Sequence, residues 1–527
     1  MEIKELLSKV NSDLERLYKA YALAYWNLAT TGKEEYAREL ERTEVELKLY
    51  LSNRDLFEMI KESLEQFGEN LDPLDKRQLT ILFHEMFPNQ LPKEAIEEVV
   101  KREVEIESIY TNYRPQIDGK EVSTNDIVEI LKTSTDIEER KKAYLASKSI
   151  GEVIAPKLID LIKIRNENAK SLGFTNYYDM MMELQELSTD EIHTLFAKIK
   201  NDTDEIFTEI KDDIDTVISK KFGVPKSEVK PWLYEDLFFQ EVPSIDDYDY
   251  DKFVKDKDVV KLVEDVYSRI GLDIRDIVER SDLYERKGKN PHAFTISIDK
   301  MDDVRVLENI RNDIKWLETT LHEYGHAVYE KYIDKTLPFI LRDPAHIFTT
   351  EAVAMFFGRL ARHPEFYEKI LNLASLNLSE ISPRLMKLLR YQLAITTRWV
   401  ITFVFFEKEL YRNPEGDLNN LWYDIVHELQ YIDLPERRMY PDWASKIHFG
   451  SSPVYYHNYL LGEILASQFS AYINKNISNG FIEPQVGEFF VEKVFRKGAS
   501  LRWDDLVEFA TSEPLTSTYL VEFIKGK

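Results

Sequence analysis

The sequence contains no cysteine among its 527 residues. Disulfide bonds and thiolate metal ligands are therefore excluded, so a metal ion would have to be held by histidine and carboxylate side chains. The lack of cysteine also fits a reducing compartment. The N-terminus, Met1 to Glu5, mixes charges and has no apolar segment, so we expect no secretory signal and predict a cytoplasmic location.

The chain also lacks long apolar runs and an excess of positive charge. The densest apolar stretch, Trp399 to Phe406, is far shorter than the roughly 20 residues that a membrane span requires, so we interpret it as a buried helix. The formal net charge is −26, and lysine and arginine do not gather around aromatic residues. We therefore predict neither a nucleic-acid partner nor a membrane partner.

What the sequence does have is apolar residues that recur at steps of three and four along most of its length. Breaks fall near Gly68 and between Pro88 and Pro92, and Ser123 is placed to start a further helix. Alternating strands and helices are not evident. We predict a mainly α-helical protein that forms a single large domain over residues 1–527, with a possible internal junction at about 223–258.

One helical stretch carries the pattern His322-Glu323-Tyr324-Gly325-His326. Residues four apart lie one above the other on a helix, so His322 and His326 can direct their imidazoles at one zinc ion. Glu323 would lean over the open side of the metal, where an activated water needs a base. Gly325 costs a helix about 1 kcal/mol relative to alanine, so we expect it to permit the close approach of another backbone or of substrate.

A zinc peptidase needs three protein ligands and one open position. Downstream of the motif, Thr349 or Thr350 is a candidate N-cap, which would place Glu351 in the first turn of the next helix. A carboxylate one helix further on suits the third ligand. On the residues alone, His346 competes with it for that role.

Upstream of the motif, His292 to Ile298 mixes β-branched and polar residues after a proline and predicts a short strand. Such a strand next to a metal could pair with the backbone of a peptide substrate. An ordinary structural hairpin is the alternative.

Near the C-terminus, one segment gathers polar side chains of another kind. Gly450 to Pro453 predicts a turn, an N-cap and a first helical residue, which would put Tyr456 and Tyr459 on one helix face. Aromatic residues at this spacing belong to a core more often than to a catalytic site. Neutral tyrosine and histidine, including the nearby His448, can however donate hydrogen bonds to an oxyanion.

On these residues the chain resembles the zinc peptidases of the gluzincin group. Within this group it resembles the angiotensin-converting-enzyme family of peptidyl-dipeptidases and the related thimet oligopeptidase and oligoendopeptidase families. In these families the third ligand is a glutamate about 25 residues past the second histidine, and Glu351 stands 25 residues beyond His326. The resemblance therefore favours Glu351 over His346. Tyr21 to Asn27 also resembles the N-terminal helix of the converting-enzyme family, so the likeness extends over nearly the whole chain.

The resemblance also implies roles for other residues. His292 and Ala293 match the His-Ala of the substrate-binding edge strand. Lys446 matches a lysine that docks the C-terminal carboxylate of a substrate, and His448 matches a histidine that assists the transition state.

The tyrosine pair of these families falls on Tyr456 and Tyr459. Tyr459 would stabilise the oxyanion, and Tyr456 would help to receive the carboxylate. The chain departs from the converting enzymes at Met355, where they have an aspartate, and at Asn458, where they have an arginine associated with chloride activation. The family's carboxylate-binding glutamine has no evident counterpart.

The resemblance implies a two-lobed helical peptidase with a deep central cleft, a small β element beside the metal and one Zn²⁺ per chain. The implied substrates are short unfolded peptides, and Lys446 favours the release of dipeptides from their C-termini. Three alternatives stay open. They are an oligoendopeptidase, a metallocarboxypeptidase and a catalytically silent helical peptide-binding protein. The metallocarboxypeptidase is disfavoured because Glu351 is flanked by Thr350 and Ala352 rather than by the Glu-Ser sequence of that family.

Overall fold

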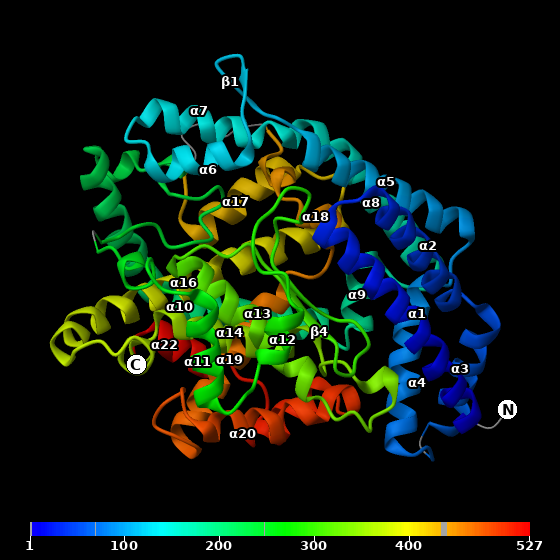
Figure 1. Cartoon of the computed structure of the whole chain (residues 1–527). Coiled ribbons are helices and arrows are strands. Elements are labelled where there is room, and N and C mark those ends of the chain that lie inside the picture. The colour runs from blue at the N-terminus through cyan, green and yellow to red at the C-terminus, as the bar shows by residue number, and fades with distance from the viewer. Residues whose placement is uncertain (1–2, 69, 247, 434–439) are drawn as a thin grey trace. The chain divides into compact units, whose positions relative to one another are not determined.

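The computed structural model describes residues 3–68, 70–246, 248–433 and 440–527. Over these residues the chain is mainly α-helical, as the sequence predicts, and it contains two short two-stranded sheets, of which only the one beside the His-Glu pattern was expected (Figure 1). The chain divides into two compact parts, called unit 1 and unit 2. Unit 1 comprises Met1–Gln90, Asp249–Leu389 and Leu461–Leu520, and unit 2 comprises Leu91–Tyr248, Arg390–Leu460 and Val521–Lys527. The predicted single domain with two lobes around a cleft stays a prediction.

Unit 1 contains the N-terminal helices and the helix of the His-Glu pattern. Its α-helices are α1 (Ile3–Thr31), α2 (Glu34–Leu51), α3 (Arg54–Phe67), α4 (Pro73–Met86), α11 (Val259–Ile270), α12 (Arg275–Arg280), α13 (Ile314–Tyr332), α14 (Ile347–Gly358), α15 (Pro364–Lys369), α20 (Pro484–Lys493) and α21 (Trp503–Thr511). Its strands are β3 (Phe294–Ser297) and β4 (Val304–Leu307).

Unit 2 contains a second set of helices and a small hairpin. Its elements are α5 (Lys93–Asn112), β1 (Gln116–Ile117), β2 (Lys120–Glu121), α6 (Thr124–Thr133), α7 (Ile137–Lys148), α8 (Ile150–Ser171), α9 (Tyr177–Leu184), α10 (Thr189–Phe222), α17 (Leu418–Gln430) and α18 (His448–Ser451). Three further helices include residues of both units, namely α16 (Ser375–Arg412), α19 (His457–Asn476) and α22 (Thr518–Ile524).

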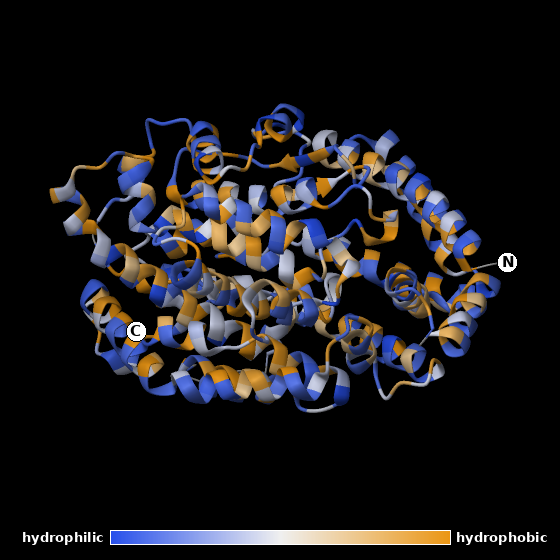
Figure 2. Cartoon of the chain, turned by 90° about the horizontal axis from the view of Figure 1, so that it is seen from below, coloured by the Kyte–Doolittle hydropathy of each residue, from blue (hydrophilic) through white to orange (hydrophobic). Residues whose placement is uncertain are grey.

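Helix α1 shows how the apolar spacing becomes a core. Leu7, Val10 and Leu14 recur at steps of three and four and are buried against α3, α4 and the segment Phe339–Leu341. Polar residues occupy the other face, so apolar and polar colours alternate along the helices in Figure 2. The burial of one stripe per helix stabilises this part of unit 1.

The second half of α1 covers the small sheet. Ala22 and Trp26 are buried against Leu307 of β4, and the ring of Phe294 in β3 packs at 6.3 Å from that of Trp26. Strands β3 and β4 pair antiparallel, with Phe294 opposite Leu307. The predicted strand is therefore confirmed, but it is shorter than His292 to Ile298.

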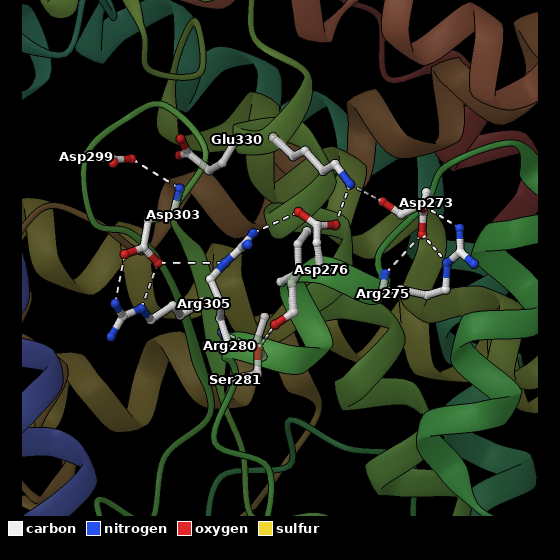
Figure 3. A network of polar contacts seen from close by, with 12 residues as sticks. Asp273, Arg275, Asp276, Arg280, Ser281, Asp299, Asp303, Arg305 and Glu330 are labelled. Carbon is white, nitrogen blue, oxygen red and sulfur yellow. Dashed lines mark hydrogen bonds and ion pairs between the residues drawn. The ribbon is translucent and has the colours of Figure 1, made fainter.

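A polar network joins the sheet to the helices beside it (Figure 3). Asp276 of α12 accepts hydrogen bonds from Arg280 at 2.8 Å and from Lys331 of α13 at 2.5 Å. Arg280 also lies 3.8 Å from Asp303, which forms an ion pair at 2.7 Å with Arg305 of β4. These contacts fix β4 and α12 against the end of α13.

The boundaries of α6, α7 and α16 can be compared with the sequence-based expectations. Thr133 ends α6, and a separate helix, α7, begins at Ile137 after Asp136 caps it. The predicted helix start at Ser123 is confirmed by a capping box with Asp126. The apolar stretch Trp399 to Phe406 lies within α16, as expected. Of the helices that the structure describes, none has the length and apolarity to cross a membrane.

Candidate active site

The site is built on the packing of α13 against α14. Gly325 makes that packing possible, because a Cβ atom at this position would lie 2.7 Å from the Cα atom of Ala354 in α14. The expectation that Gly325 admits another backbone is confirmed. The close approach brings the His-Glu pattern of α13 next to the carboxylate that α14 carries.

Three side chains meet at this contact. The ligand atoms of His322, His326 and Glu351 all lie within 4.8 Å of one another. The two Nε2 atoms are 3.2 Å apart, and they lie 3.8 Å (His322) and 4.0 Å (His326) from Glu351 Oε2. These spacings fit a common point about 2.1 Å from each atom, which is the length of a zinc bond to nitrogen or oxygen.

The chemistry of the three donors also fits a divalent metal. Loss of hydration lowers the pKa of His322 to about 4 and the pKa of His326 well below its usual value. Both imidazoles are therefore neutral near pH 7 and can offer lone pairs. Thr350 Oγ1 lies 2.7 Å from His326 Nδ1, so this nitrogen can donate to the hydroxyl while Nε2 faces the other two ligands.

The capping of α14 corrects the prediction for Glu351. The N-cap residue is His346, whose Nδ1 accepts from the Phe348 N–H, and neither Thr349 nor Thr350 occupies the N-cap position. The helix starts at Ile347, so Glu351 lies in its second turn rather than its first. Thr349 instead completes the cap, because its Oγ1 accepts from the His346 N–H at 3.1 Å.

Glu323 lies next to the three converging side chains and is buried. Thr295 of β3 donates from Oγ1 to the Glu323 backbone oxygen at 2.8 Å and lies 3.0 Å from its carboxylate Oε2. Burial raises the pKa of Glu323 to about 7, the Thr295 hydrogen bond opposes the shift, and the negative charge of Glu351 adds to it. The carboxyl group is thus tuned towards accepting a proton near neutral pH.

The predicted peptide-binding pair, His292 and Ala293, directly precedes β3. The His292 N–H is held by Asn290 Oδ1 at 2.9 Å, and the His292 residue is exposed. Since Thr295 of the same strand contacts Glu323, the small β element lies beside the candidate metal site, as expected.

Unit 2 brings together the other predicted residues. Lys446 Nζ donates to Gln240 Oε1 at 3.0 Å and lies 5.2 Å from the ring centres of Phe238 and Trp399 and 5.7 Å from that of Tyr456. Loss of hydration lowers the pKa of Lys446 to about 8, against the opposing influence of nearby carboxylates. A bound anion would therefore stabilise the charged form of this lysine.

The tyrosine pair is arranged differently from the prediction. Helix α19 starts at His457, so Pro453 is not its first residue and Tyr456 precedes the helix. The rings of Tyr456 and Tyr459 are nevertheless in contact, with centroids 5.1 Å apart, and His448 lies 5.2 Å from Tyr456. The Tyr456 hydroxyl accepts from Trp399 Nε1 at 2.7 Å and retains its own proton for donation.

The sequence-based prediction gave no site role to three residues that contact predicted site residues, namely Thr295 (at Glu323), Thr350 (at His326) and Gln240 (at Lys446). Thr350 stood out only as a possible cap, and Thr295 only as part of a β-like pattern. Gln240 lies in a loop 206 residues before Lys446, and no local pattern links the two. Only Thr350 had a sequence signal that could have identified it, because it immediately precedes Glu351.

The chain is similar to known peptidases along its whole length. The model of Peptidase family M3 matches residues 130–524, and the angiotensin-converting-enzyme model matches residues 1–213. Carboxypeptidase 1 of Bacillus subtilis is 23% identical over 568 residues, which cover 100% of this chain and 97% of the relative. Thermostable carboxypeptidase 1 of Pyrococcus furiosus is 25% identical over 234 residues, which cover 40% of this chain and 46% of the relative.

These matches agree with the predicted resemblance to gluzincin peptidases. The M3 model spans the His-Glu pattern, the strand before it and the C-terminal tyrosines in a single match. Because that match covers most of its length, the chain belongs to peptidase family M3 and is a zinc metallopeptidase.

Proposed function

We propose that His322, His326 and Glu351 hold one Zn²⁺ per chain. The observation that carries this proposal is the convergence of two neutral imidazoles and one buried carboxylate, whose ligand atoms are 3.2 to 4.0 Å apart and can therefore share one zinc ion. Zinc held there supplies a Lewis acid that lowers the pKa of a water molecule and polarises the scissile carbonyl. His346 is assigned no ligand role, since its Nδ1 caps α14.

Glu323 is the general base in this proposal. Its carboxylate takes a proton from the attacking water and then delivers it to the leaving amine. The Thr295 hydroxyl, within hydrogen-bond reach of Oε2, orients the carboxylate for this transfer. The burial of Glu323 supports the role, because loss of hydration raises the pKa of its carboxyl group and makes the carboxylate a stronger base.

The cluster in unit 2 supplies the hydrogen-bond donors. Tyr459 and His448 donate to the developing oxyanion, a contribution on the order of 3 kcal/mol per donor. Lys446 and Tyr456 receive the C-terminal carboxylate of the substrate. The position of the Lys446 ammonium group among aromatic rings supports this assignment, because the group has lost hydration there. A substrate carboxylate would stabilise its positive charge in place of water.

The substrate is a short peptide, and its backbone is held by His292 and Ala293 at the start of β3. With a carboxylate bound at Lys446, the enzyme releases dipeptides from the C-terminus. A second candidate is the release of single C-terminal residues. It is favoured by the names of the two relatives, both of which are carboxypeptidases.

A cytoplasmic location stays a prediction.

Mass spectrometry of the products from one peptide tests the mode of cleavage. The peptide is offered with a free and with an amidated C-terminus. Dipeptides released from the free form alone would support the proposal, and single amino acids would support the second candidate. Internal cuts in both forms would contradict both and assign the enzyme to the oligoendopeptidases.

A further inference from the structure

The loop between α18 and α19 adopts a conformation that its residues disfavour. Val454 has a φ of +54°, in the left-handed region that β-branched residues rarely adopt, and the residue is buried. This loop, residues 452–456, leads directly to Tyr459 in the first turn of α19. The backbone angle at Val454 therefore sets the direction in which the chain enters the helix that carries Tyr459.

Side chains from two other helices hold Val454 in place. Glu407 of α16 accepts the Val454 N–H through Oε1 at 2.9 Å. Gln185, the C-cap residue of α9, donates from Nε2 to the Val454 carbonyl oxygen at 2.9 Å. Both backbone polar groups of the strained residue are thus bound by side chains that are distant from it in the sequence.

Gln185 also binds the start of α19. Its Oε1 accepts from Asn458 Nδ2 at 3.1 Å and lies 3.2 Å from His457 Nε2. The same amide is fixed to its own helix, because Nε2 also lies 3.1 Å from the Met181 carbonyl oxygen. A single glutamine therefore connects the strained residue to the two residues that precede Tyr459.

We propose that Gln185 and Glu407 are positioning residues that set the placement of the Tyr459 hydroxyl. The inference rests on the proposed role of Tyr459 as the oxyanion donor. Without these two side chains, Val454 would relax to the extended region and change the entry of the chain into α19. A displacement of about 1 Å at a catalytic group lowers the rate by roughly a hundredfold.

The test replaces Gln185 with methionine, which keeps its length and removes the hydrogen bonds of the side-chain amide to Val454, His457 and Asn458. We expect Gln185→Met to lower kcat by roughly tenfold to a hundredfold, with KM within about twofold and zinc retained. Gln90→Met is the matched control, since Gln90 Nε2 likewise bonds the carbonyl oxygen four residues earlier and one from another segment, Leu51. This control should leave kcat unchanged. An unchanged kcat in Gln185→Met would overturn the proposal.

The Glu407 variants separate a missing hydrogen bond from a missing side chain. Glu407→Gln keeps an acceptor for the Val454 N–H and should retain kcat, whereas Glu407→Leu should lower it to the level of Gln185→Met. Thermal melting monitored by circular dichroism verifies that each variant is folded. Equal kcat values for the two folded variants would contradict the role of this hydrogen bond.

A double-mutant cycle with Tyr459→Phe decides whether Gln185 acts through Tyr459. If it does, Gln185→Met should have little further effect on kcat once the tyrosine hydroxyl is removed. The same loss in both backgrounds would overturn the inference while leaving the role of Tyr459 intact. A Tyr459→Phe variant with the kcat of the unmodified enzyme would instead refute the proposed oxyanion role itself.

Discussion

The metal region of unit 1 and the tyrosine region of unit 2 are constructed in different ways. The metal region takes its two histidines and its base from five consecutive residues of one helix, and its third ligand from the adjacent helix. The tyrosine region takes its order from side chains such as Gln185 and Glu407, which lie far from it in the sequence. Helical periodicity sets up the two histidines and the base of the first region, and one helix contact adds its third ligand, whereas the second region depends on hydrogen bonds between residues distant in the sequence.

The largest effect is expected in the metal region, from Glu323→Gln. The amide keeps the shape of the side chain but cannot accept a proton, so kcat should fall by up to about 10⁴-fold with zinc still bound. Measurement of kcat together with the zinc content checks this prediction. Glu318→Gln, on the same helix and paired with Arg362 at 2.8 Å, is the control and should remain active. Substantial turnover by Glu323→Gln would remove Glu323 from the base role.

In the tyrosine region, Tyr459→Phe should lower kcat by roughly a hundredfold, because it deletes one oxyanion donor and leaves the ring in place. Zinc content should not change. Tyr455→Phe is the control within the same segment, since its ring lies 5.4 Å from that of Tyr459. Steady-state kinetics of both variants on one peptide would show whether the loss of kcat is specific to the Tyr459 hydroxyl. Equal losses of kcat in the two variants would contradict the assignment of Tyr459 as the oxyanion donor.

Lys446→Met should act on binding rather than on the chemical step. We expect KM for a peptide with a free C-terminus to rise about tenfold, and the preference over the amidated peptide to disappear. Lys211→Met provides the comparison, because Lys211 also lies near aromatic rings, at 5.2 Å from Tyr234, but pairs with Asp215. A preserved preference for the free carboxylate in Lys446→Met would place the carboxylate site elsewhere.

The smallest effect concerns stability. Gly325→Ala places a methyl group 2.7 Å from the Ala354 Cα atom, so α13 and α14 must separate, at a cost of about 1 to 3 kcal/mol in the free energy of unfolding. Urea denaturation measures this change. Gly358→Ala meets its nearest atom, His322 Cβ, at 3.4 Å and should cost less. If Gly358→Ala proves the more damaging, the close helix contact is not centred on Gly325.

The sequence was most informative where function depends on local spacing. The four-residue step between His322 and His326 predicted both the helix and the shared direction of the side chains, because helix geometry alone relates them. Gly325, unfavourable inside a helix, likewise predicts a close backbone contact, although the sequence does not identify its partner, Ala354.

Prediction was wrong where a competing local interaction was stronger. His346 caps α14 through a ring nitrogen, although histidine is not among the usual capping residues, and the helix therefore starts earlier than the threonines indicated. Pro453 suggested a first helical residue, but Val454 takes a left-handed conformation and delays α19 to His457. The side chains that hold Val454 come from elsewhere in the chain, so no local pattern could have revealed them.

The most direct test of the central claim is the zinc content of the purified protein and of two single variants. The account predicts about one zinc per chain for the unmodified protein and for His346→Gln, and loss of zinc for a folded Glu351→Ala variant. Stoichiometric zinc in Glu351→Ala, or its loss in a folded His346→Gln variant, would contradict the proposed ligand set.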